Sequence, residues 1–170
     1  MLEGRAKRIM EPMILGRVDA PDGIELDRES LSTINRWVTK SALVYDFITR
    51  PPTASEAIRH RFYVTREPFA QSRIWLGSHV PEDAQLTEVW PIRLVREGTG
   101  SPVGLFKFTI RIGYLVMQLL LDVRDQPEQV PRRPEPNPLL IQTWPDHRGG
   151  SWPPPEAMNG ELLDAFARRL

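Results

Sequence analysis

Three histidines are the first residues to consider, because imidazole can transfer protons and bind metal ions near neutral pH. They are His60, His79 and His147, and no two lie close enough in sequence to form a paired-histidine zinc helix. His60 comes one predicted helical turn after Glu56, a pair that could hold a metal or face phosphate but is also typical of a solvated helix face. His79 follows a predicted strand, where a packing or capping role is the alternative to chemistry.

The segment Asp146-His147-Arg148 is the most site-like of the three histidine positions. It lies in a predicted loop before two glycines, and its groups could transfer protons or hold phosphate, although a loop histidine beside a turn is the plainer interpretation. The chain has no cysteine, no nucleophile elbow, no P-loop and no dinucleotide-binding glycine motif. We therefore find no complete catalytic or metal site in the sequence, and expect a chain that is not an enzyme and uses no cofactor.

Arg93, Lys107 and Arg111 are candidate nucleic-acid contacts, because they fall on neighbouring predicted strands. If the strand register aligns them, they could form one basic face of a sheet, a surface on which nucleic acid can bind. Strand alternation puts Phe106 and Phe108 on the opposite face from Lys107 and Arg111, which weakens the idea of a base-stacking platform. The alternative is an ordinary solvent-exposed face.

Two tryptophans in proline-rich segments are candidates for a partner surface. Trp144 precedes Pro145, and Trp152 precedes three consecutive prolines. Together with His147 they could form a contact surface for a protein partner, or the indole rings could staple their loops onto the core. A further alternative is that residues 132–136 (RRPEP) act as a polyproline II ligand.

Hydrophobic periodicity predicts the elements that position these residues. Helices are predicted over residues 3–15, 28–48 and about 55–66 and after Asn159, and strands over 73–80, 86–96, 104–112, 114–123 and 139–144. Asp27 should cap the second helix, whose apolar stripe is widened by Trp37, Val44 and Phe47 and so indicates a place in the core. A proline-rich loop is expected at about 124–138, and 146–155 should be irregular. Helices first and strands later predict a single α+β domain, residues 1–170, with a mostly antiparallel sheet.

Composition limits the class of protein. The 170 residues carry 22 basic and 22 acidic side chains, a balance that argues against a dedicated non-specific nucleic-acid binder. Arg greatly outnumbers Lys, which suits phosphate or carboxylate binding but also fits a GC-rich genome. The first residues lack the apolar run of a signal peptide, and no stretch approaches a membrane span. We therefore expect a cytoplasmic protein without a membrane partner.

Several separated segments are also informative as a set. They are Leu2-Glu3 with Ala6-Lys7 and residues 12–16 (PMILG), then 37–45 (WVTKSALVY), 73–77 (RIWLG), 113–118 (GYLVMQ), and 141–145 (IQTWP) with 152–155 (WPPP). In order and spacing this set resembles the C-terminal region of HNH endonuclease-like proteins of bacteria and their phages, over nearly the whole chain. In that family a zinc-stabilised HNH module precedes this region and carries the metal, the phosphate site and the water-activating histidine. The resemblance implies an accessory region, because the chain lacks that module and no catalytic residue of the family falls on it.

These observations support three hypotheses. The leading one is a non-catalytic accessory or interaction domain that binds a protein partner or helps to position nucleic acid for a nuclease supplied elsewhere. The second is a stand-alone nucleic-acid-binding protein, and the third is a phage-encoded inhibitor or decoy that occupies the partner of a host nuclease. The oligomeric state is not predicted by the sequence.

Overall fold

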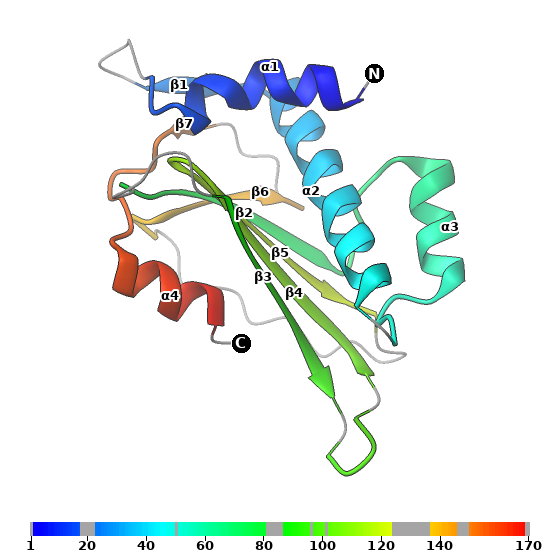
Figure 1. Cartoon of the computed structure of the whole chain (residues 1–170). Coiled ribbons are helices and arrows are strands. Elements are labelled where there is room, and N and C mark those ends of the chain that lie inside the picture. Colours follow the sequence, from blue (N-terminus) through cyan, green and yellow to red (C-terminus); the bar gives the residue numbers. More distant parts are fainter. Residues whose placement is uncertain are drawn as a thin grey trace.

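The described part of the chain folds into helices on both faces of an antiparallel sheet (Figure 1). The computed structural model describes residues 2–17, 23–49, 51–80, 87–95, 97–100, 102–123, 137–145 and 150–168. Within them the elements are α1 (Leu2–Ile14), β1 (Ile24–Leu26), α2 (Arg28–Ile48), α3 (Glu56–Thr65), β2 (Ser72–Ser78), β3 (Thr87–Val95), β4 (Pro102–Ile112), β5 (Leu115–Asp122), β6 (Leu140–Trp144), β7 (Gly150–Trp152) and α4 (Gly160–Arg168). This is an α+β fold, as the sequence predicts.

The main sheet has five strands in the order β3-β4-β5-β2-β6, and every neighbouring pair is antiparallel. The hairpin between β4 and β5 turns at Gly113, which has a φ of 55°, a conformation that glycine adopts at no steric cost. Its register pairs Phe106 with Leu121 and Phe108 with Leu119, so apolar residues of both strands lie on one face. A second sheet consists of the two short strands β1 and β7.

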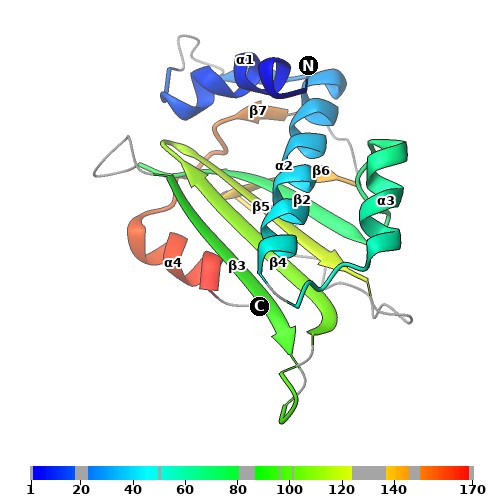
Figure 2. The same ribbon diagram turned by 45° about the vertical axis from the view of Figure 1, so that its right-hand side comes forward.

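Helix α2 covers the apolar face of the main sheet (Figure 2). The helix begins where the Asp27 carboxylate accepts a hydrogen bond of 2.7 Å from the Ser30 amide, which confirms the predicted N-cap. That hydrogen bond holds the pKa of Asp27 below its ordinary value of 3.8. Leu31, Ile34 and Val38 are fully buried beneath the helix, and burying a side chain of this size stabilises the fold by about 1.5–3 kcal/mol.

The other helices complete two layers around the sheet. Helix α1 packs against α2, and the Tyr114 amide in the β4–β5 turn donates to the Ile14 carbonyl at its end. Helix α3 lies alongside the C-terminal half of α2 in both views (Figures 1 and 2). Helix α4 packs on the opposite face, where Leu163 joins Trp75 and Val116 in a second apolar cluster. The Asn159 side chain accepts from the Leu162 amide at 2.8 Å, which confirms the predicted cap.

Most predicted elements are confirmed, with bounds that differ by one or two residues. The exceptions are β1, expected only as the approach to α2, and β7, expected to be irregular. Each has three residues, too few to show an alternating pattern. The predicted proline-rich loop lies outside the described residues except for its last two positions, which form a turn before β6. None of the helices described is both long and apolar enough to cross a membrane.

Candidate functional site

The three candidate basic residues of the sheet do not form one face. Arg93 pairs with Phe106 across the β3–β4 register, so it lies on the face that α2 covers, and its guanidinium donates to the Thr49 and Pro51 carbonyls after α2. Lys107 and Arg111 alternate with the phenylalanines of β4 and lie on the α4 face. The register therefore does not place the three residues on one basic face, and Lys107 and Arg111 are buried rather than part of an ordinary solvent-exposed face. The register of β3 against β4, which the sequence does not reveal, decides this.

Lys107 anchors the end of α4. The residue is 2% exposed, and its ammonium donates a 2.5 Å hydrogen bond to the Phe166 carbonyl and lies 5.7 Å from the centre of the Phe166 ring. The Gln118 side-chain amide donates to the same carbonyl at 3.2 Å. Cations are favourable at the negative C-terminal end of a helix. Both polar side chains therefore have a structural role, which is to fix α4 on the sheet.

Arg111, by contrast, lines a cleft of about 640 Å³ between α4 and the sheet, here called the α4 cleft. Its side chain is buried, its Nε lies 3.1 Å from a carboxylate oxygen of Glu88, and its Nη1 lies 3.3 Å from Nδ1 of the buried His79. Trp90 of β3 forms another part of the wall. From α4 and the residues before it come Ala157, Met158, Asn159, Gly160, Leu163, Asp164 and Arg168.

His79 was the predicted packed or capping histidine, and its backbone explains why it is buried. Its amide donates to the Tyr114 carbonyl at 2.9 Å, and the residue forms an isolated parallel bridge with Met158 just before α4. This bridge brings His79 and the start of α4 to the same end of the sheet. The sequence indicates His79 and Arg111 separately, but not their contact, because 32 residues separate them.

Trp144, His147 and Trp152 were candidates for a partner surface, and for the two tryptophans this prediction is wrong. Trp152 is 1% exposed and donates from Nε1 to the Gly77 carbonyl at 3.2 Å. Trp144 is half-buried and donates to the Phe69 carbonyl at 2.8 Å. Both therefore staple their segments to the core, which is the alternative that the sequence left open. His147 and the whole segment 146–149 lie outside the described residues, as do residues 132–136.

No metal site is found in the described ranges. They contain no group of three or more histidine, aspartate or glutamate side chains that could hold an ion. His60 and Glu56 are both exposed on α3, as expected for a solvated helix face.

The largest group of exposed apolar side chains lies on α2 and α3, here called the α2–α3 surface. Its members are Val44, Phe47, Ile48, Tyr63 and Val64, each between 47% and 65% exposed. They are half of the ten large apolar side chains that are exposed in the described part of the chain, and Leu94 and Val95 add two more at the adjoining end of β3. The apolar periodicity predicts that Val44 and Phe47 belong to a stripe that faces the core. That prediction is wrong, because the stripe is wider than the sheet can cover.

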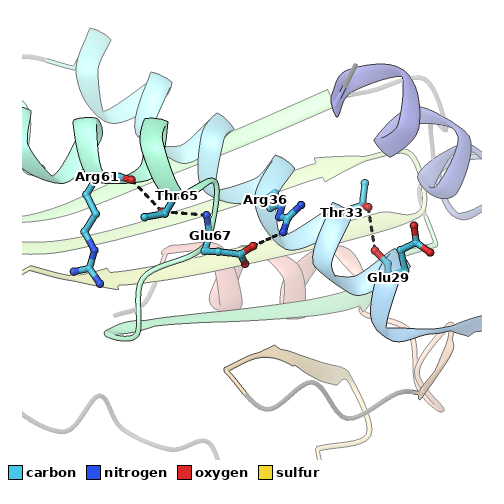
Figure 3. A network of polar contacts seen from close by, with 6 residues as sticks. All are labelled: Glu29, Thr33, Arg36, Arg61, Thr65 and Glu67. Carbon is cyan, nitrogen blue, oxygen red and sulfur yellow. Dashed lines mark hydrogen bonds and ion pairs between the residues drawn. The ribbon is translucent and has the colours of Figure 1, made fainter.

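Arginines lie over the exposed aromatic rings of this surface. The Arg59 guanidinium is 5.1 Å from the centre of the Phe47 ring, and so connects α3 with α2. The Arg66 guanidinium is 4.4 Å from the centre of the Tyr63 ring. Figure 3 shows a further link between the helices, in which Arg36 of α2 contacts the Glu67 carboxylate just after α3.

A shallow pocket lies beside the C-terminal end of α3, where α1 and α2 also contribute residues. Leu2, Glu3, Arg36, Lys40 and Arg66 line this space of about 370 Å³. Lys40 contacts the Glu3 carboxylate, and this hydrogen bond lowers the pKa of Glu3. With two of its three cations paired to carboxylates, the pocket has little free positive charge.

The chain was also compared with known proteins. No family model, no curated protein and no solved structure matches the chain. The similarity to HNH endonuclease-like proteins thus remains a prediction from the sequence.

The segments that carry this resemblance contact one another in the fold. The Gly16 of the PMILG segment abuts Tyr114 of the GYLVMQ segment, so that a Cβ at Gly16 would lie 2.9 Å from the tyrosine ring. Gly77 of the RIWLG segment accepts a hydrogen bond from Trp152 of the WPPP segment. These motifs therefore build the core around β2, and none of them contributes a residue to the α4 cleft.

Proposed function

We propose that this chain is a non-catalytic interaction domain that binds an acidic protein surface through its α2–α3 surface. The observation that carries the proposal is the concentration of exposed apolar side chains on two adjacent helices. Scattered exposed apolar residues are normal in proteins, whereas a cluster of this kind marks an interaction site. Phe47 and Tyr63 are the anchors, because aromatic side chains dominate the binding energy of most interfaces.

The chemistry around these anchors selects the partner. Helix α3 carries Arg59, His60 and Arg61 against one carboxylate, Glu56, and Arg66 follows its last turn. Arginines stacked on aromatic rings keep N–H groups at their edge for carboxylates, and Arg59 uses Nη1 for the Ala54 carbonyl, so its other N–H groups would serve this purpose. Two copies of the chain facing each other through this surface would bring arginine against arginine. An acidic partner with apolar anchors is therefore favoured over a homodimer.

The resemblance supports a further part of this proposal, namely that the domain accompanies a nuclease of the HNH kind. On this interpretation the catalytic module is supplied outside this chain, and the domain recruits a protein to it or holds one in place. The support is the set of sequence motifs in the family's order.

The test uses a display library of random 16-residue peptides selected against the purified chain. We expect the enriched peptides to combine acidic residues with two or more large apolar ones, and to lose at least about a hundredfold in affinity for the double variant F47S/Y63S, since two hot-spot side chains are removed. The matched control is L15S/L162S, which removes two apolar side chains, each 45% exposed, that lie outside α2 and α3. This control should leave the affinity unchanged.

Three outcomes would contradict the proposal. Peptides without acidic enrichment, or peptides that bind F47S/Y63S as tightly as the original chain, would show that another surface binds. A stable dimer in light scattering that F47S/Y63S dissolves would make a second copy the occupant. Binding of a 30-nucleotide single- or double-stranded DNA that weakens steeply with salt and is lost in F47S/Y63S would make nucleic acid the ligand.

A further inference from the structure

The α4 cleft contains a buried charged group, the Arg111 guanidinium, that the packing of α4 does not explain. Lys107 and Gln118 on the same face of the sheet are directed to the Phe166 carbonyl and fix the C-terminal end of α4. Arg111 and His79 lie in the wall of the cleft, are 5% and 4% exposed and contact each other, and Arg111 also contacts Glu88. Arg111 is buried while its partner Glu88 is 41% exposed, and removing the arginine charge from water offsets part of the attraction between them. A binding role is the alternative explanation.

The three side chains present donors and an acceptor side by side. A guanidinium can only donate, so the contact of Arg111 Nη1 with Nδ1 of His79 makes that nitrogen an acceptor. Among the described residues no group accepts a hydrogen bond from Nη2 of Arg111, and its Nε, although 3.1 Å from Glu88, lacks hydrogen-bond geometry. Glu88 is 41% exposed and keeps further carboxylate lone pairs for a ligand.

The charge of the cleft wall selects the kind of ligand. Glu88 lies against Arg111, and Asp164 is ion-paired with Arg168 one turn along α4, so the charges cancel in pairs. A strongly charged ligand would have to displace one of these pairs. An uncharged ligand with an acceptor for the guanidinium and a donor for the carboxylate could bind without breaking either pair.

The apolar part of the cleft wall indicates which kind of uncharged ligand could bind. Trp90, Met158 and Leu163 lie beside the polar trio. Indole rings bind flat aromatic groups by stacking, and thioether sulfur also packs well against rings. Ligand sites commonly have a volume of about 300–1,000 Å³, and the cleft of about 640 Å³ lies within this range, with polar and apolar residues in similar numbers in its wall.

We propose that the α4 cleft binds a planar, uncharged heterocycle that has hydrogen-bond donors and acceptors on its edge, the class to which nucleobases belong. The Arg111 guanidinium recognises the acceptor side of the ring edge, the Glu88 carboxylate recognises the donor side, and Trp90 contacts the ring. This site is independent of the protein-binding role assigned to α2 and α3, because it lies on the other face of the sheet.

Guanosine is the probe, because the O6 and N7 atoms of guanine suit an arginine and its N1–H and N2–H groups suit a carboxylate. Titration of the ¹⁵N-labelled full chain with guanosine should give saturable shifts confined to the indole N–H of Trp90 and the amides of Met158, Gly160 and Leu163. Glu88→Gln and Arg111→Lys should each weaken binding at least about tenfold, as expected when one partner of a bidentate contact is changed. The control Glu161→Gln, on α4 but outside the cleft wall, should bind like the original chain.

The variants need a check on folding, because Arg111 is buried. Thermal melting followed by circular dichroism should show that Glu88→Gln, whose side chain is 41% exposed, remains folded at the titration temperature. No saturable shift at millimolar guanosine would overturn the proposal, and so would shifts that folded Glu88→Gln retains in full. Binding of inorganic phosphate at the same residues, with no competition from guanosine, would show that the cleft is an anion site instead.

Discussion

Lys107 and Arg111 lie four residues apart on β4, on the same face of the sheet, and nevertheless have different roles. The lysine ammonium is directed to a helix carbonyl, while the arginine contacts a carboxylate and an imidazole in a cleft wall. The type of residue does not decide between these roles. What decides is the position along the strand relative to α4, whose C-terminal end lies over Lys107 and whose N-terminal end lies near Arg111.

Gly77 on β2 is a residue at which one methyl group should be costly. A Cβ there would lie 2.9 Å from Cε of Met158, 3.1 Å from the Leu139 carbonyl oxygen and 3.2 Å from Cδ2 of Leu140. The methionine can move, but the backbone carbonyl is held beside β6. We expect Gly77→Ala to lower the free energy of unfolding by about 1–3 kcal/mol, the usual cost of overpacking. Urea denaturation followed by circular dichroism measures this.

Gly4→Ala is the matched control for Gly77→Ala. Gly4 lies in α1 with nothing within 4 Å of the added methyl group, so alanine should stabilise the helix by up to about 1 kcal/mol. Equal effects of the two substitutions, in sign and size, would show that the close packing around β2 does not limit stability.

At the scale of the element, periodicity in the sequence predicts nearly all of the helices and strands, because each buries an apolar face with the expected repeat. Side-chain alternation also correctly separates Phe106 and Phe108 from Lys107 and Arg111. Three features require knowledge of the fold. They are the pairing of Arg93 with Phe106, the exposure of Phe47 on a helix whose apolar stripe is wider than the sheet can cover, and the α4 cleft. Each of these depends on how separate elements meet, and local patterns contain no such information.

The contact between α2 and β6 depends on one buried polar pair. Asn35 donates from its side-chain Nδ2 to the Thr143 backbone carbonyl at 3.0 Å, and the Thr143 hydroxyl donates to the side-chain Oδ1 of Asn35 at 2.6 Å. Both residues are 0% exposed. We expect Asn35→Leu to destabilise the chain by about 1–3 kcal/mol, because it removes the side-chain donor to the Thr143 carbonyl and leaves the Thr143 hydroxyl with only its longer contact of 3.4 Å to the Ile74 carbonyl. The measurement is the free energy of unfolding in urea.

A double-mutant cycle with Thr143→Val separates this pair from simple packing effects. In the double variant the Thr143 hydroxyl is absent, so Asn35→Leu should cost less there than alone, with a coupling free energy of at least about 0.5 kcal/mol. Strict additivity of the two substitutions would mean that the hydrogen bonds do not join α2 to β6 energetically.

For the molecule as a whole, the sheet separates two surfaces of different chemistry. One face is covered by α1, α2 and α3, and the arginine-rich apolar surface lies on the outside of α2 and α3 (Figure 1). The other face carries α4 and the cleft with its paired charges. Between the two surfaces lie the buried side chains of Phe106, Phe108, Met117 and Leu119. These side chains are apolar, so they offer no polar contacts through which a change of charge on one face could affect the other.

This arrangement predicts that the two sites act independently. F47S/Y63S should weaken binding of the selected acidic peptides at least about a hundredfold and leave the guanosine affinity within about twofold. Glu88→Gln should weaken guanosine binding and leave the peptide affinity within about twofold. The reason is that substitutions more than about 7–10 Å apart with no shared partner are usually additive. Isothermal titration of each ligand with and without a saturating amount of the other measures the coupling directly. Allosteric coupling is typically about 5–150-fold, so a change of this size in either titration would show that the sheet transmits a conformational change between its faces. Unchanged affinities in both directions would mean that the domain can hold its protein partner whether or not the cleft is occupied.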